Sequence, residues 1–130
     1  MTATVFVSPL VREPGRGWRL EKVASGAVLA ELVQGVFDSP ARRHGLLGLE
    51  GLVTSALVIA PCRFIHTFFT RRPIDTVFVD REGVVVRVRH GIRPNRLSGA
   101  WGAFAAIELP AGQARRADVR VGDRLVLTPA

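Results

Sequence analysis

Residues 74–89 contain two short runs rich in β-branched side chains, separated by a four-residue turn. The first run is Ile74–Val79, the second covers residues 84–89, and Asp80-Arg81-Glu82-Gly83 joins them. Glycine takes positive φ without strain, so Gly83 suits the last position of a hairpin loop closed by a bulge. The pattern predicts an antiparallel hairpin in which Gly83 has positive φ and the Asp80 carboxylate accepts hydrogen bonds from the turn.

Other segments of the chain show strand and helix patterns on both sides of this hairpin. Apolar runs of strand length cover residues 18–24, 55–60, 103–109 and 124–128, and a run at 27–33 suits a strand or a short helix. Val5 and Val7 suggest a short opening strand, and residues 91–102 have the Pro, Asn, Ser and Gly content of a loop. Short helices are predicted at 40–47 and 110–117, because proline suits the first position of a helix.

The order of these elements determines the predicted fold class. Strands outnumber helices and do not alternate with them regularly, which argues against a doubly wound parallel sheet. We therefore expect a mainly β chain (β-rich α+β) that forms a single sandwich- or barrel-like domain, mostly antiparallel, with two short helices. The apolar positions of the clearest strands predict one shared core, consisting of Phe78, Val84, Val86, Ile107, Leu125 and Leu127.

Length and charge limit the function classes. A chain of 130 residues with 48% hydrophobic residues is long enough to fold as one domain, and no apolar run approaches the roughly 20 residues of a membrane span. The absence of a secretory signal pattern and the single cysteine lead us to expect a cytoplasmic protein. The net charge of +7 comes almost entirely from arginine. It fits an anionic partner such as nucleic acid or lipid, but it also fits the codon usage of a GC-rich genome.

Several segments occur together in an order that resembles a known family. They are RRHGLLG, HTFFTRRPIDTVFVDREGVVV, AAIELPAGQARRADVRVGD and RLVL, within residues 36–127. This order is similar to the domain-of-unknown-function family 192, whose pattern includes Pro-Ile/Leu-Asp, here ending at Asp75, and Leu-Glu-x-x-Ala-Gly, here containing Glu108. Thr70 stands where the family usually has methionine, as does Leu47. The resemblance implies a compact β-rich fold and no defined activity. We assign residues 1–35 to N-terminal strands of the same domain and 36–130 to the core that resembles the family.

The titratable residues around the hairpin offer few catalytic or metal-binding patterns. Cys62 and His66 are four residues apart, which on a strand places them about 13 Å apart, too far for one ion, so no metal site or cofactor is expected. Asp75 and Asp80 have an odd spacing and would point to opposite faces of one strand. Asp75 lies in an apolar strand and needs an arginine or several N–H donors if it is buried.

Two function classes and one further alternative remain open from the sequence. The first is a non-catalytic binding or accessory domain with an unknown partner. Its candidate ligand-binding residues surround the start of the hairpin: His66, Thr67, Thr70, Arg72 and Asp75. The second is a small hydrolase that uses His66 and Asp75. The third is a domain that binds nucleic acid through its arginines.

Overall fold

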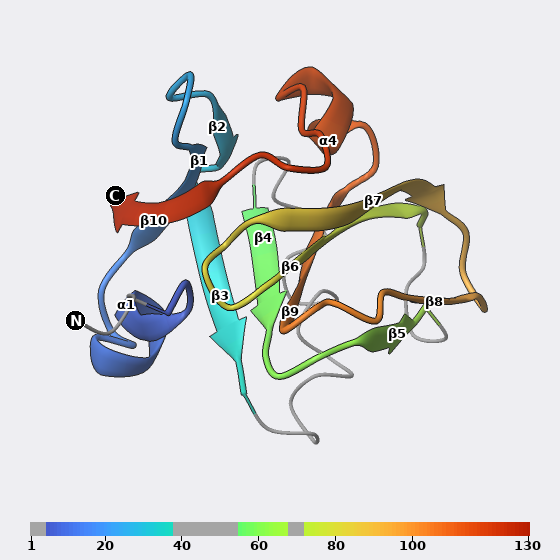
Figure 1. The fold of residues 1–130 in the computed structure, drawn as a ribbon, viewed down its shortest axis with the longest axis horizontal. Helices are drawn as coiled ribbons and strands as arrows, with labels where there is room; N and C mark the ends of the chain where they lie inside the picture. The colour runs from blue at the N-terminus through green and yellow to red at the C-terminus, as the bar shows by residue number, and fades with distance from the viewer. Residues whose placement is uncertain (1–4, 38–54, 68–71) are drawn as a thin grey trace.

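The computed structural model describes residues 5–37, 55–67 and 72–130. Its centre is a five-stranded sheet in the order β3–β4–β9–β6–β7 (Figure 1). The strands are β3 (Leu32–Val36), β4 (Ser55–Ile59), β9 (Ala105–Pro110), β6 (Ile74–Val79) and β7 (Val85–Ile92). Only β3 and β4 pair in parallel within this sheet, so the expectation of a β-rich, mostly antiparallel domain is confirmed.

The hairpin of β6 and β7 has the predicted turn. Gly83 has φ +86°, and its N–H donates to the Asp80 carbonyl over 3.2 Å. The Asp80 side chain accepts hydrogen bonds from the N–H groups of Glu82 and Val84, at 2.9 and 3.0 Å. Asp80 is therefore a turn-forming residue.

One face of the central sheet packs on a second, three-stranded sheet in the order β10–β1–β2. These strands are β10 (Leu125–Pro129), β1 (Trp18–Lys22) and β2 (Val28–Ala30). Helices α1 (Ser8–Arg12) and α4 (Gln113–Arg116) lie on the same side, and both contribute to the buried apolar cluster. In Figure 1 this sheet lies to the left of the central strands, with α4 above them. The arrangement is sandwich-like, and no sheet among the described strands closes into a barrel.

The other face of the central sheet is covered by an antiparallel ribbon. The ribbon consists of β5 (Phe64–His66) and β8 (Leu97–Gly99). Ile65 points inward and joins a second apolar cluster that includes Ile59, Phe78 and Ala106. Because layers cover both faces, every residue of β4 and of β6 is buried. Polar side chains on these strands are therefore buried as well.

The single predicted core is wrong, because the central sheet separates two clusters. Phe78 belongs to the ribbon-side cluster, whereas Ile107, Leu125 and Leu127 belong to the cluster between the two sheets. The pairing register also shifts by one between Phe78 and Val79. This shift makes Val85 the buried residue and leaves Val84 and Val86 half-buried.

Three local predictions also differ from the structure. The opening strand at Val5 and Val7 is wrong, because the residues that follow form α1, with Pro9 in its first turn. The predicted loop at 91–102 contains the end of β7 and all of β8. The helix at 110–117 shortens to α4, because Pro110 still belongs to β9 and Gly112 has φ +93°. The predicted helix at 40–47 lies outside the described residues.

Candidate functional site

Asp75 is fully buried and fixes three backbone segments. Its Oδ1 accepts a hydrogen bond from Gly91 N–H at 2.9 Å, and its Oδ2 accepts from Gly112 and Ala114 N–H, both at 3.0 Å. The expected partner is therefore backbone N–H rather than arginine. These bonds join β6 to the end of β7 and to the start of α4, which gives Asp75 a structural role.

The other predicted ligand-binding residues are dispersed. Thr67 is buried, and its hydroxyl donates to the Arg93 carbonyl at 2.6 Å and accepts from Arg96 N–H at 2.8 Å. It therefore holds the loop that precedes β8. His66 is half-buried on β5 opposite Leu97, and Arg72 is exposed just before β6. Thr70 lies outside the described residues.

The structure does not bring His66 and Asp75 together. Asp75 points to the same face as Val77 and Val79, which pack between the two large sheets. His66 belongs to the ribbon on the opposite face of the central sheet. Within residues 5–37, 55–67 and 72–130, no three His, Cys, Asp or Glu side chains gather in a way that could hold a metal ion.

The outer face of the ribbon exposes large apolar side chains. Phe64 is 60% exposed, Leu97 73% and Trp101 80%. The rings of Phe64 and Trp101 meet edge to face, with centroids 5.5 Å apart. Phe64 and Leu97 on the ribbon, together with Trp101 just after β8, indicate a contact surface rather than scattered exposure.

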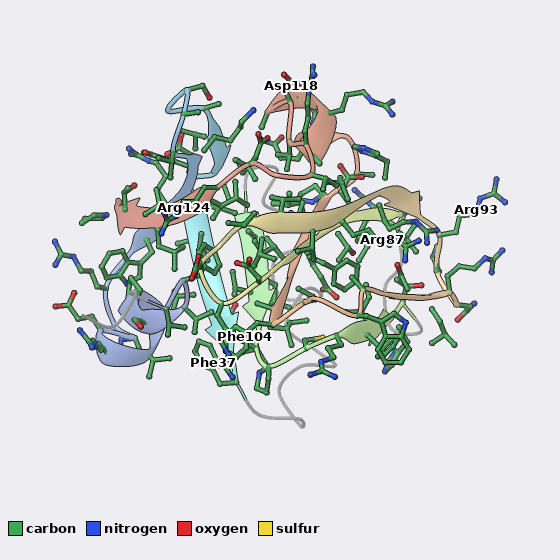
Figure 2. The ribbon with its side chains drawn as sticks, in the orientation of Figure 1. Phe37, Arg87, Arg93, Phe104, Asp118 and Arg124 are labelled. Carbon is green, nitrogen blue, oxygen red and sulfur yellow. The ribbon has the colours of Figure 1, made fainter. Side chains whose placement is uncertain are left out.

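Arginines surround these apolar side chains. Arg87 Nη1 donates to the Gly99 carbonyl at 2.5 Å, and Arg89 Nη1 donates to Ser98 Oγ at 3.4 Å, so both β7 side chains reach β8. Arg93 and Arg96 are exposed in the connection between these strands, and Figure 2 shows Arg93 extending from the edge of the molecule. The half-buried Arg89 lies beneath the ribbon. We call the exposed surface the ribbon face, consisting of Arg63, Phe64, Arg87, Arg93, Arg96, Leu97 and Trp101.

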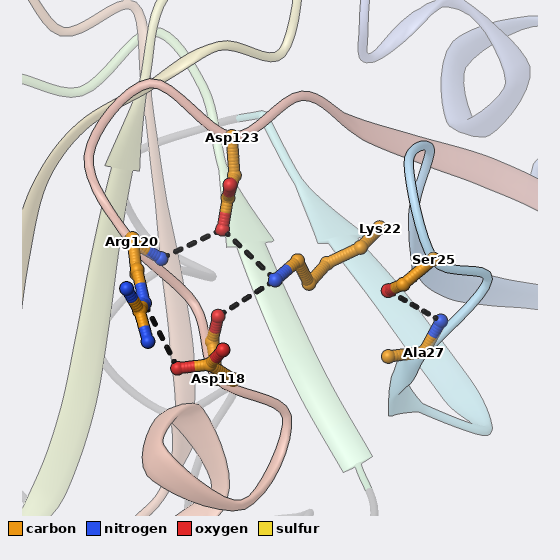
Figure 3. A network of polar contacts seen from close by, with 6 residues as sticks. All are labelled: Lys22, Ser25, Ala27, Asp118, Arg120 and Asp123. Carbon is orange, nitrogen blue, oxygen red and sulfur yellow. Dashed lines mark hydrogen bonds and ion pairs between the residues drawn. The ribbon is translucent and has the colours of Figure 1, made fainter.

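The acidic residues that form ion pairs lie outside the ribbon face. The ion pairs among the described residues join cations of the segment 16–22, or Arg120, to Glu13, Glu21, Glu31, Asp118 and Asp123. Figure 3 shows one such group, in which Lys22 Nζ lies 3.2 Å from Asp123 and donates to the Asp118 carbonyl at 2.7 Å. In the part of the chain that the structure describes, no arginine of the ribbon face forms an ion pair.

A groove of about 470 Å³ borders the ribbon face near Arg63 and Trp101. The hairpin turn also lines this groove, and there the Arg81 guanidinium lies 4.4 Å from the centre of the Phe104 ring. Asp80 and Glu82 also line the groove, so the purely basic region ends there.

Glu108 is a second unusual feature, and the sequence interpretation assigned it no role. It lies on β9, is 6% exposed, and stands directly opposite Thr76 on β6 and Leu57 on β4. Burial raises the pKa of its carboxyl group to about 7. The sequence feature that could have pointed to Glu108 is a single carboxylate within the apolar run 105–109.

The comparisons with known proteins identify the family. A model of the family DUF192, described as "Uncharacterized ACR", matches residues 25–127. The chain belongs to this family of small uncharacterised proteins, which confirms the expected resemblance. No curated protein matches the chain.

Two solved structures share the fold. A protein of unknown function from Novosphingobium aromaticivorans DSM 12444 is 19% identical, with a TM-score of 0.70 over 84% of this chain and 82% of that chain. A protein from Sinorhizobium meliloti 1021, described as a "putative transcription regulator", is 23% identical, with a TM-score of 0.70 over 85% of this chain and 91% of that chain. None of the helices in the described residues has the length and apolar content needed to cross a membrane.

Proposed function

We propose that this chain is a non-catalytic binding domain and that its ribbon face binds single-stranded nucleic acid. The observation that carries the proposal is a group of arginines that form no ion pair with any described residue and that lie beside exposed aromatic rings. Phosphates supply the missing negative charge, and unpaired bases supply flat faces that stack on aromatic side chains. Cytoplasmic residence is part of the proposal, since nucleic acid and reducing conditions suited to a single cysteine occur there.

The geometry favours a single strand over a duplex. Phe64 and Trp101 project from a short ribbon, and their rings stand at 90° to each other, so a base can stack on one ring while the other supports it. Such stacking requires unpaired bases. The relative from Sinorhizobium meliloti, described as a "putative transcription regulator", adds support of a general kind.

The hydrolase alternative has weaker support. It needs His66 and Asp75 within hydrogen-bond reach of one substrate, yet the Asp75 side chain points to one face of the central sheet and His66 lies in the ribbon on the other face. Asp75 already accepts three backbone hydrogen bonds. A binding domain does not require His66 and Asp75 to meet at one site.

Fluorescence anisotropy with labelled oligonucleotides of about 12 nucleotides tests the proposal. The arms are single-stranded DNA, single-stranded RNA, the matching duplex, and vesicles of anionic phospholipid. We expect the single strands to bind more tightly than the duplex, and Trp101→Ala to weaken single-strand binding about tenfold. Vesicle binding without oligonucleotide binding would contradict the proposal, and so would equal binding by the Trp101→Ala variant.

A further inference from the structure

Three buried polar side chains lie on the ribbon-side face of the central sheet. Glu108 on β9 stands between Leu57 on β4 and Thr76 on β6. Ser55 precedes Leu57 by two positions, so it points to the same face and is a diagonal neighbour of Glu108. Their exposed fractions are 6% for Glu108, 0% for Thr76 and 1% for Ser55.

The side-chain atoms of these three residues form no hydrogen bonds with the described residues. Neither the Ser55 Oγ nor the Thr76 Oγ1 has a hydrogen-bond partner among the described residues. Glu108 likewise takes part in none of the hydrogen bonds or ion pairs within residues 5–37, 55–67 and 72–130. Asp75, on the opposite face of the same sheet, has three partners, so burial in this fold does not by itself leave a carboxylate unpaired. Native proteins rarely bury several adjacent polar groups without partners, so such a group is a candidate site for a bound water or ligand.

Among the described residues, the cation in the same cross-strand row forms no ion pair with Glu108. Arg89 lies beyond Thr76 in the same cross-strand row, and its guanidinium donates to Ser98 Oγ on the ribbon. The same row contains Gln34 on β3 opposite Leu57, and the apolar residues Leu57 and Ile74 also lie on this face. Among the described residues, no hydrogen bond or ion pair joins a cation to the oxygens of these three side chains.

The chemistry of the three side chains selects a ligand group. A carboxylate and two hydroxyl oxygens provide at least three acceptors, and a primary ammonium group provides three N–H donors and one positive charge. Magnesium and calcium ions take six or more oxygen ligands, so either ion would have to bring several waters to side chains that are only 0–6% exposed. We propose that Glu108, Thr76 and Ser55 bind the primary ammonium group of a small molecule. The low exposure of Glu108 favours a small amine over a lysine side chain of a partner protein.

Thermal shift titrations with methylammonium chloride at about pH 8 test this proposal, because the amine is then charged and the carboxyl is ionised. Tetramethylammonium chloride is the control for a cation without N–H donors, and magnesium chloride is the control for a metal. We expect a saturable rise in Tm with methylammonium alone. An equal rise with all three salts, or a saturable rise with magnesium alone, would overturn the proposal.

Matched variants locate the binding. Glu108→Gln keeps the size of the side chain and removes its charge, so we expect at least tenfold weaker methylammonium binding, and Thr76→Val should weaken it less. Glu21→Gln removes a carboxylate on β1 and should leave it unchanged. Chemical shifts of the Glu108 carboxyl carbon, followed by NMR during the titration, provide a readout that does not depend on stability. Unchanged shifts, or full binding by Glu108→Gln, would contradict the assignment.

Discussion

The Asp75 carboxylate accepts a hydrogen bond of 3.0 Å from the backbone N–H of Gly112, 37 residues further along the chain. The same oxygen accepts a second bond from Ala114, and the other oxygen accepts one from Gly91. One buried side chain thus fixes the position of α4 and the end of β7 relative to β6.

We expect Asp75→Asn to destabilise the protein by about 3 kcal/mol, because an amide NH₂ cannot accept the bonds that one carboxylate oxygen accepts. Urea unfolding measures the change. Asp118→Asn is the matched control on an exposed ion pair, where little change is expected. Equal stability of Asp75→Asn and the parent protein would contradict the structural role.

Gly83→Ala should destabilise the protein more than Gly122→Ala. Both glycines have positive φ, +86° and +95°, so both substitutions carry the same backbone cost of about 1 kcal/mol. A Cβ at Gly83 would also lie 2.6 Å from the Leu125 carbonyl oxygen and 2.9 Å from the Phe6 ring, whereas a Cβ at Gly122 meets open space. Chemical denaturation measures the loss of stability in both variants. Equal losses would contradict the prediction, because they would show that the turn shifts to make room for the added Cβ.

Phe78→Ala should cost about 3–5 kcal/mol, because the side chain is fully buried in the ribbon-side cluster. Phe64→Ala removes the same number of atoms from a side chain that is 60% exposed and should cost far less. Guanidinium unfolding of both variants makes the comparison. A small loss for Phe78→Ala would mean that this cluster is not a packed core.

Stability should depend on pH through Glu108. Burial raises its pKa from 4.5 to about 7, so the folded state holds this proton more tightly than the unfolded state does. The contribution is complete below about pH 4.5 and is lost as pH rises through 7, a change of about 3 kcal/mol. Denaturation across this range should show the decline, Glu108→Gln should remove it, and Glu21→Gln should retain it. If the stability of Glu108→Gln declined with pH as steeply as that of the parent protein, the pH dependence would come from other titratable groups.

Local chemistry was sufficient to predict some of these features from sequence. The hairpin turn was predictable from Asp80 and Gly83, and the polar partners of Asp75 follow from the cost of burying a carboxylate. The faces of β7 were not predictable, because a register shift exchanges the side chains that point inward.

Other features depend on contacts between distant segments. Glu108 is buried only because separate layers cover both faces of the central sheet, which no local pattern specifies. The arginines look scattered along the sequence and gather only where β7 lies beside β8. Thr67 was predicted to contact a ligand, yet its hydroxyl holds the loop before β8.

The salt dependence of single-strand binding by two arginine variants tests the central claim most directly. Arg93→Gln/Arg96→Gln removes two charges from the ribbon face, and Arg12→Gln/Arg115→Gln removes two exposed charges from α1 and α4. For the parent protein we expect the logarithm of the binding constant to fall with the logarithm of salt concentration with a slope of about −3, from four phosphate contacts. The ribbon-face variant should bind at least tenfold more weakly at low salt, with a slope shallower by about 1.4, while the control variant keeps the parent slope. Equal weakening in both variants would show that only net charge matters and would contradict a binding site on the ribbon face.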